Sequence, residues 1–118
     1  MSQQINDFLQ RLSNQENDIE FTQVIELIDQ HYDFTPTAFT NGEQRNETGE
    51  NSGSCKVFSF ALLHSLSESE ALALFAQYYQ DVKATPDAND HQNIRQFMQH
   101  GYAGLVFEAQ ALSLKPLS

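Results

Sequence analysis

The sequence contains a single cysteine, and no apolar run approaches the roughly 18 residues that mark a membrane-spanning helix. One cysteine cannot form an internal disulfide, so the fold does not depend on an oxidising compartment. The chain of 118 residues also has no internal repeat and no low-complexity block. We therefore predict a single domain over residues 1–118, without a membrane span and with enough buried surface to fold alone.

Basic residues are also scarce. Six Lys and Arg stand against 16 Asp and Glu, which gives a formal net charge of −10. A surface of this charge repels phosphate backbones and anionic headgroups, so we expect neither nucleic acid nor an anionic membrane surface as a partner. Residues 1–15 lack both a basic segment and a continuous apolar stretch, and we expect no cleavable signal peptide.

Apolar residues recur with the period of a helix in several segments, which predict about five helices. These segments are 5–12, 18–32, 57–63, 67–82 and 90–98. We expect the second helix to begin at Asn17 or Asp18 and the fifth to be capped by Asp90. The third is apolar on all sides, which predicts a central, buried helix. Ser67 and Glu70 have the spacing of a capping box at the start of the fourth.

Two segments predict extended structure. Residues 34–40, in which Pro36 prevents a helix, suit a strand, and the apolar residues of 105–111 alternate as a strand requires. We expect these segments to pair as a small two-stranded antiparallel ribbon backed by helices. The polar stretch 43–54 is predicted to be an exposed loop. The predicted fold class is mainly α, with α+β as the alternative, in one compact domain.

The lone cysteine raises the question of nucleophilic catalysis. Cys55 follows a Ser/Gly turn and precedes an apolar run, which places its thiol near a helix start, where a thiolate is stabilised. His91, between Asp90 and Asn93, is the best candidate for a base, so Cys55 and His91 are candidate catalytic residues of a hydrolase or transferase. The alternative is a structural cysteine, since free cysteine is among the most buried residue types. Both interpretations stay open.

The polar residues before Cys55 indicate a binding role as an alternative to catalysis. Backbone N–H groups of a Gly/Ser turn can bind an anion or a partner, with nearby basic side chains as counter-charges. The structural alternative is that Ser52 or Ser54 only caps the helix. We expect the start of the 90–98 helix to face the 41–56 loop. The candidate binding residues are Asn41, Arg45, Asn46, Ser54, Lys56, Asn93 and Arg95.

Metal ligation is not indicated. Side chains four residues apart share a helix face, and the four histidines have no such spacing; they are His31, His64, His91 and His100. The segment PDANDH is too short for a calcium loop and lacks its terminal glutamate. We predict no metal site and no cofactor.

Several long blocks of the sequence are distinctive, namely YDFTPTAFTNG, NSGSCKVFSFA, YYQDV, DHQNIRQFM and GYAGLVFEAQAL. Together they resemble the HopJ type III effector family over residues 20–112. The sequence departs from the family pattern at Tyr102, where tryptophan is common, and at Ala109, where glycine is common. The resemblance implies a protein that a bacterial type III secretion system delivers into plant cells. It implies no catalytic activity and no catalytic residues.

Three hypotheses of function follow. The first is a soluble, acidic HopJ-like protein that binds a protein or a small ligand through the 41–56 loop and the start of the 90–98 helix. The second is an enzyme that uses Cys55 and His91. The third is a protein that stays in the bacterial cytoplasm and is not secreted. The sequence indicates neither the identity of the partner nor the oligomeric state.

Overall fold

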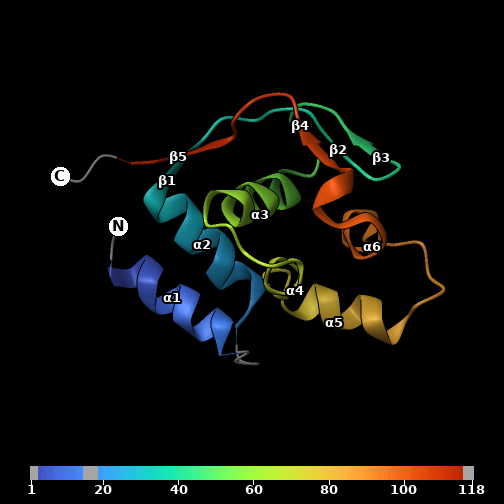
Figure 1. Cartoon of the computed structure of the whole chain (residues 1–118), viewed down its shortest axis with the longest axis horizontal. Helices are drawn as coiled ribbons and strands as arrows, with labels where there is room; N and C mark the ends of the chain where they lie inside the picture. The colour runs from blue at the N-terminus through green and yellow to red at the C-terminus, as the bar shows by residue number, and fades with distance from the viewer. Residues whose placement is uncertain (1–2, 15–18, 116–118) are drawn as a thin grey trace.

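The computed structural model describes residues 3–14 and 19–115, which form one mainly helical domain with two small antiparallel sheets (Figure 1). This confirms the predicted fold class. In chain order the elements are α1 (Gln3–Ser13), α2 (Phe21–His31), β1 (Tyr32–Phe34), β2 (Phe39–Asn41), β3 (Gln44–Asn46), α3 (Ser52–Leu63), α4 (Glu68–Ala73), α5 (Gln77–Ala84), α6 (Gln92–His100), the 3₁₀ helix η1 (Gly101–Gly104), β4 (Leu105–Phe107) and β5 (Leu112–Leu114).

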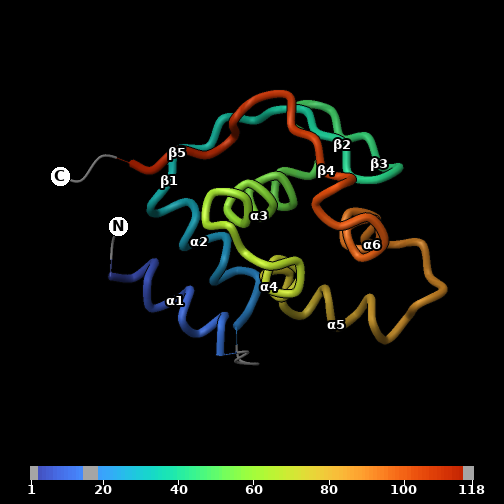
Figure 2. Tube along the Cα trace, in the orientation of Figure 1, coloured from blue at the N-terminus to red at the C-terminus, as the bar shows by residue number. Residues whose placement is uncertain are grey.

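Helix α3 lies at the centre, with the other helices and the strands around it (Figure 2). Residues 57–61 are all buried, which confirms the prediction of a central helix, whereas Leu62 and Leu63 at its end are exposed. The ring of Phe58 contacts three other rings, those of Phe39, Phe75 and Phe97. Aromatic contacts of this kind add about 0.5–1.5 kcal/mol each beyond the burial of their area. Helix α3 therefore links the strands to α6 and to the segment between α4 and α5.

The strands join the middle of the chain to its end. Strand β2 pairs with β3 and with β4, and Phe39 lies opposite Phe107. Strand β1 pairs with β5, and Tyr32 lies opposite Leu114. The predicted pairing between the two extended segments is thus present, but as two short ladders in place of one ribbon. The extended segment that carries β1 and β2 and the one that carries β4 and β5 run side by side over α3 (Figure 1).

The prediction that residues 43–54 form an exposed loop is wrong at both ends. Gly42, with a φ of +59°, reverses the chain, so that Gln44–Asn46 pair with β2 as a hairpin. A left-handed φ favours glycine because it has no Cβ. Asn46 is fully buried, and α3 begins at Ser52 rather than near Val57. Only the part between β3 and α3 is an exposed loop.

The predicted helix over 67–82 is two helices. The capping box of Ser67 and Glu70 is present, but α4 ends at Ala73 and α5 begins at Gln77. Leu72, Leu74 and Phe75 are all buried. After them the backbone N–H of Ala76 donates to the Ala73 carbonyl oxygen, only three residues back, and residue 76 has a φ of +53°, so the chain leaves the helical path at this residue.

Two other predicted helix starts differ from the structure. Helix α2 begins at Phe21 and α6 at Gln92, whose N-cap is His91 rather than Asp90. The side chain of Asp90 is instead bonded to Arg95. The predicted caps Asn17 and Asp18 lie outside the described residues.

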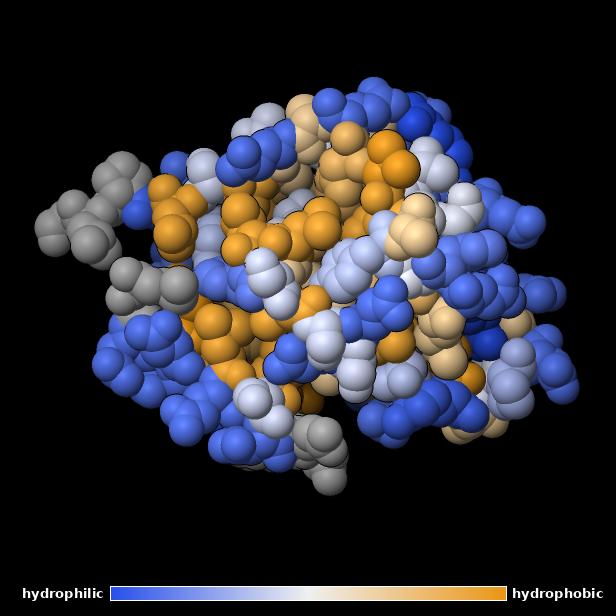
Figure 3. All heavy atoms as spheres, in the orientation of Figure 1, coloured by the Kyte–Doolittle hydropathy of each residue, from blue (hydrophilic) through white to orange (hydrophobic). Residues whose placement is uncertain are grey.

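The surface carries apolar side chains between the strands and the lower helices (Figure 3). Among the described residues, the large apolar ones that are exposed are Leu62, Leu63, Tyr78, Met98, Val106 and Leu114. No helix in the described ranges is long and apolar enough to cross a bilayer.

Candidate functional site: a cavity between two helix starts

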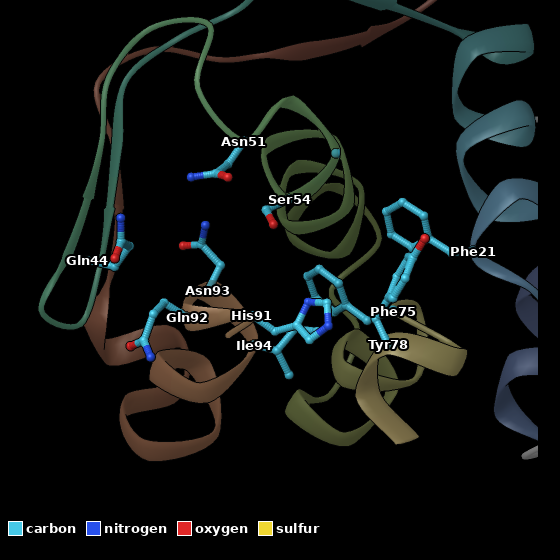
Figure 4. A pocket seen from close by; sticks show the side chains of 11 residues that line it. Phe21, Gln44, Asn51, Ser54, Phe75, Tyr78, His91, Gln92, Asn93 and Ile94 are labelled. Carbon is cyan, nitrogen blue, oxygen red and sulfur yellow. The ribbon is translucent and has the colours of Figure 1, made fainter. Parts of the chain in front are cut away.

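A cavity of about 510 Å³ lies between the start of α3 and the start of α6 (Figure 4). Strand β3 closes one side of it, and the start of α2 and the α4–α5 region close the other. The structure therefore brings together the 41–56 segment and the start of the 90–98 helix. The lining residues are Phe21, Gln44, Asn51, Gly53, Ser54, Phe75, Tyr78, His91, Gln92, Asn93 and Ile94.

The two sides of the cavity differ in chemistry. Figure 4 shows amide side chains on one side and aromatic rings on the other, with the His91 ring between them. The ring of Tyr78 lies 5.4 Å from that of His91 and 5.1 Å from that of Phe21, measured between centroids. Tyr78 is 37% exposed, and Phe21 and His91 are half-buried. These rings form a continuous wall that remains open to solvent.

Both helices begin in the same unusual way. Their N-cap residues, Asn51 and His91, each have a left-handed backbone with φ of 51° and ψ of 48°. Neither side chain accepts a hydrogen bond from the helix that it precedes. The first N–H groups of a helix have no acceptor within the helix. Residues from both first turns line the cavity, so backbone donors of α3 and α6 are available close to it.

Behind the amide side lies a group of hydrogen-bonded asparagines, which we call the asparagine cluster: Asn41, Asn46, Asn51 and Asn93. Asn46 Oδ1 accepts from Asn51 Nδ2 at 2.6 Å and from Asn93 Nδ2 at 2.9 Å. Asn41 Nδ2 donates to the backbone oxygen of Asn93 at 2.7 Å. Because buried amides must find partners, the cluster ties β2 and β3 to both helix starts.

A second contact fixes the hairpin to α6. Gln96 Oε1 accepts a hydrogen bond from the backbone N–H of Glu43 at 2.9 Å. A Cβ on Gly42 would lie 2.5 Å from the same Gln96 oxygen and 2.3 Å from His100 Cδ2. The hairpin therefore approaches α6 so closely that position 42 has no room for a side chain.

Comparison with known proteins places the chain in a family. The family model described as HopJ type III effector protein matches residues 5–112. The chain belongs to the HopJ family. It is also similar to VPA0580, a protein of unknown function with a crystal structure, at 46% identity and a TM-score of 0.91. That match covers 98% of this chain and 95% of VPA0580. A comparison with curated proteins found no match.

The thiol of this HopJ chain lies away from the cavity. Cys55 is 2% exposed, and its Sγ donates to the Thr37 carbonyl oxygen at 3.9 Å. Burial raises the pKa of the Cys55 thiol, against the smaller opposing effects of its hydrogen bonds with the Thr37 backbone and the Ser59 side chain. A catalytic thiolate needs access and a lowered pKa. His91 lines the cavity and Cys55 does not, so the structure separates the two catalytic candidates.

Two of the predicted binding cations of the HopJ chain form ion pairs outside the cavity. Arg45 Nη2 lies 2.6 Å from Glu108 Oε2, and Arg45 Nε lies 3.1 Å from Glu47 Oε1. These hydrogen bonds, that to Glu47 first, raise the pKa of Arg45. Lys56 Nζ lies 2.7 Å from Asp29 Oδ1. Neither cation is among the lining residues.

The third predicted cation, Arg95, fastens the segment that precedes α6. Its Nη1 donates to the Thr85 carbonyl oxygen at 2.9 Å, and its Nη2 donates to Asp90 Oδ1 at 2.7 Å. The hydrogen bond from Arg95 is the main cause that holds the pKa of Asp90 below its usual range. The chain between α5 and α6 is thus closed around one guanidinium, and its last residue is His91.

Of the seven predicted binding residues, Ser54 and Asn93 line the cavity, and Asn41 and Asn46 support it from the cluster. His91, a catalytic candidate, also lines the cavity, and the remaining lining side chains were not predicted. Asn51 could have been predicted as a lining residue, because it directly precedes the start of α3. The aromatic residues of the wall could not, because their spacing in the sequence is that of ordinary core residues in a helix.

The remaining histidines serve other contacts. His64 lies at the C-cap of α3, where its Nε2 is hydrogen-bonded to Tyr32 Oη. Burial raises the pKa of Tyr32 to about 12 and lowers the pKa of His64. Within residues 3–14 and 19–115, no group of three or more His, Cys, Asp or Glu side chains is placed to hold a metal ion.

Proposed function

We propose that this HopJ protein acts by binding, and that its ligand occupies the cavity between the starts of α3 and α6. The observation that carries the proposal is the convergence there of two helix starts whose N-caps make no side-chain cap. The volume of about 510 Å³ falls within the range of about 300–1,000 Å³ that is typical of small-ligand sites. A short segment of a protein partner would be accommodated in the same way.

The rigidity of the surroundings supports binding. The asparagine cluster holds the amide side, and Arg95 fastens the segment that carries His91. A site that is already in its bound geometry loses less conformational entropy when the ligand arrives. The burial of Cys55 and its raised pKa favour this proposal over the Cys55 and His91 enzyme.

The test is a cavity-filling variant with a matched control. Ser54→Leu places a larger side chain in the cavity, while Ser52→Leu makes the same change on the same turn at a residue that does not line it. A fragment library is screened against the ¹⁵N-labelled protein by NMR. We expect hits whose shift changes map to the lining residues, and whose affinity falls by about tenfold or more in S54L only. Hits that map elsewhere, or that both variants bind equally, would contradict the proposal.

The place of action is a separate part of the proposal. The family description as type III effector proteins supports delivery by a type III secretion system. Fractionation of a producing strain, with and without a working secretion apparatus, tests it. Delivery predicts the protein in the medium only when the apparatus works. Equal retention in both strains would support the alternative of a protein that works in the bacterial cytoplasm.

A further inference from the structure

We propose, resting on the binding function above, that the ligand of the cavity is a neutral saccharide. The lining has two features that suit this class: uncharged side chains that both donate and accept hydrogen bonds, and a wall of rings. Each feature is visible in Figure 4, the amides on one side and the rings on the other.

Among the described residues, the lining offers no charged Lys, Arg, Asp or Glu side chain to pair with an ionic ligand. The three nearby cations that would recognise an anion are engaged in ion pairs elsewhere. A net charge of −10 further disfavours an anion. A cationic ligand, in turn, finds no carboxylate in the lining.

The unused polar atoms suit hydroxyl groups. Gln44 and Gln92 use their Nε2 atoms on the backbone oxygens of Arg45 and Asn89, which leaves their Oε1 atoms without a partner in the described structure. Ser54 Oγ also has no partner there. Together with the N–H groups of two helix starts, these atoms offer acceptors and donors side by side. A sugar hydroxyl, which donates and accepts at one atom, matches this mixture.

The ring wall suits the other face of a sugar. The C–H groups on one face of a pyranose carry weak positive charge, and the face of an aromatic ring is negative. Tyr78 is the most accessible ring of the wall at 37% exposed, and its ring contacts those of Phe21, in an edge-to-face arrangement, and His91, at a tilt of 38°. A sugar that stacks on Tyr78 would turn its hydroxyl edge toward the amide side.

The arrangement of the polar atoms favours a saccharide over a peptide. An extended peptide needs a row of backbone partners, such as an exposed strand edge. Here the polar atoms come from β3, from the segment before α3, from α3 itself and from the start of α6. They surround one compact space and form no row, which is the geometry that a compact ring with hydroxyls on several sides requires.

The experiment is an NMR titration of the ¹⁵N-labelled full chain with four separate probes. Two are neutral oligosaccharides, a glucose oligomer and an N-acetylglucosamine oligomer; the others are sodium phosphate and a neutral Gly/Ser peptide. We expect at least one oligosaccharide to shift the amides of Ser54, Tyr78 and Gln92, while phosphate and the peptide leave them unchanged.

Variants at one position sharpen the test. Tyr78→Ala removes the ring and is expected to weaken oligosaccharide binding by about tenfold, whereas Tyr78→Phe keeps the ring and the affinity. Gln80→Ala, on the same helix but outside the lining, controls for changes in fold. Equal binding by Y78A and wild type would overturn the stacking and with it the proposal.

The outcomes separate the ligand class from the site. If the peptide or phosphate shifts the lining amides and both oligosaccharides do not, the saccharide assignment is overturned and the binding site stands. If neither these probes nor the fragment hits shift the lining amides, both proposals are overturned.

Discussion

The side-chain amides of Asn46 and Asn93 form a reciprocal pair. Each Nδ2 donates to the Oδ1 of the other residue, at 3.1 Å from Asn46 and 2.9 Å from Asn93. The two residues are 0% and 7% exposed. Because one belongs to the β2–β3 hairpin and the other to α6, the pair sets the distance between two walls of the cavity.

Asn93→Ala should destabilise the fold strongly. It leaves the amides of Asn41 and Asn46 buried with fewer partners, and each such loss costs about 1–3 kcal/mol. We expect a fall of about 2–4 kcal/mol in the free energy of unfolding, measured with urea. Asn89→Ala is the matched control, since Asn89 is exposed and offers only its backbone oxygen to Gln92. Similar stability of the two variants would contradict the role of the cluster.

Arg95→Lys should loosen the segment between α5 and α6. Lysine keeps the charge but cannot reach Thr85 and Asp90 with a planar fork of donors. We expect faster amide hydrogen exchange in residues 85–91 and a loss of about 1–2 kcal/mol, because the side chain is only 11% exposed. Arg45→Lys, at an exposed ion pair, should leave stability unchanged. Unchanged exchange in R95K would show that the segment holds without the guanidinium.

Stability should fall as the pH drops through the range in which histidine titrates, in part because of His64. Burial lowers the folded-state pKa of His64. Its contribution is therefore present above the unfolded pKa of about 6.5 and is lost as the pH falls through the folded value. We expect His64→Gln to reduce the difference in unfolding free energy between pH 8 and pH 5. An equal difference in H64Q and in the wild type would exclude this role of His64.

Cys55 should be inert in the folded protein. Its thiol is buried and its pKa is raised, so little thiolate is exposed near neutral pH. We expect iodoacetamide to label Cys55 at pH 7.5 only when urea is present, as followed by mass spectrometry. Complete labelling of the native protein within minutes would contradict this burial and would restore the enzyme hypothesis.

Glycine at position 76, in the break between α4 and α5, should stabilise the fold. Ala76 has a φ of +53° and a ψ of −123°, a conformation that is unfavourable for a residue with a Cβ. We expect Ala76→Gly to raise the free energy of unfolding by about 1 kcal/mol. Ala84→Gly at the exposed end of α5 should lower it by up to about 1 kcal/mol. A loss of stability in both variants would show that position 76 is not strained.

The helices were predictable where one residue pattern decided the structure. The period of residues 5–12 gave α1, and the capping box of Ser67 and Glu70 gave the start of α4. The break near Ala76 was not predictable, because neither glycine nor proline marks it and the residues around it continue a helical pattern. The hairpin at 44–46 was not predicted, because a polar segment is expected to lie in solvent. Asn46 is buried because its side chain finds hydrogen-bond partners in other elements, which the sequence does not indicate.

The position of the candidate site in the fold was predictable from the sequence, but most of its lining residues were not. The sequence indicated that residues 41–56 and the start of the 90–98 helix would meet, and Ser54, His91 and Asn93 do line one cavity. The three predicted cations, Arg45, Lys56 and Arg95, do not line the cavity. Each forms an ion pair with a carboxylate, because carboxylates greatly outnumber basic residues in this sequence. The sequence pattern could not distinguish Tyr78 from a core residue, because the exposure of its ring depends on how α5 packs against α6.

The two ladders above α3 also affect how the chain is made. Strands β4 and β5 stand near the end of the described chain, and their partners β2 and β1 are synthesised long before them. Pairings of such large sequence separation form slowly and only after both segments are available. On the ribosome, β1 therefore has no partner strand, and β2 has only β3, until β4 and β5 emerge. The nascent protein remains incompletely folded, and accessible to chaperones, until β4 and β5 have been synthesised.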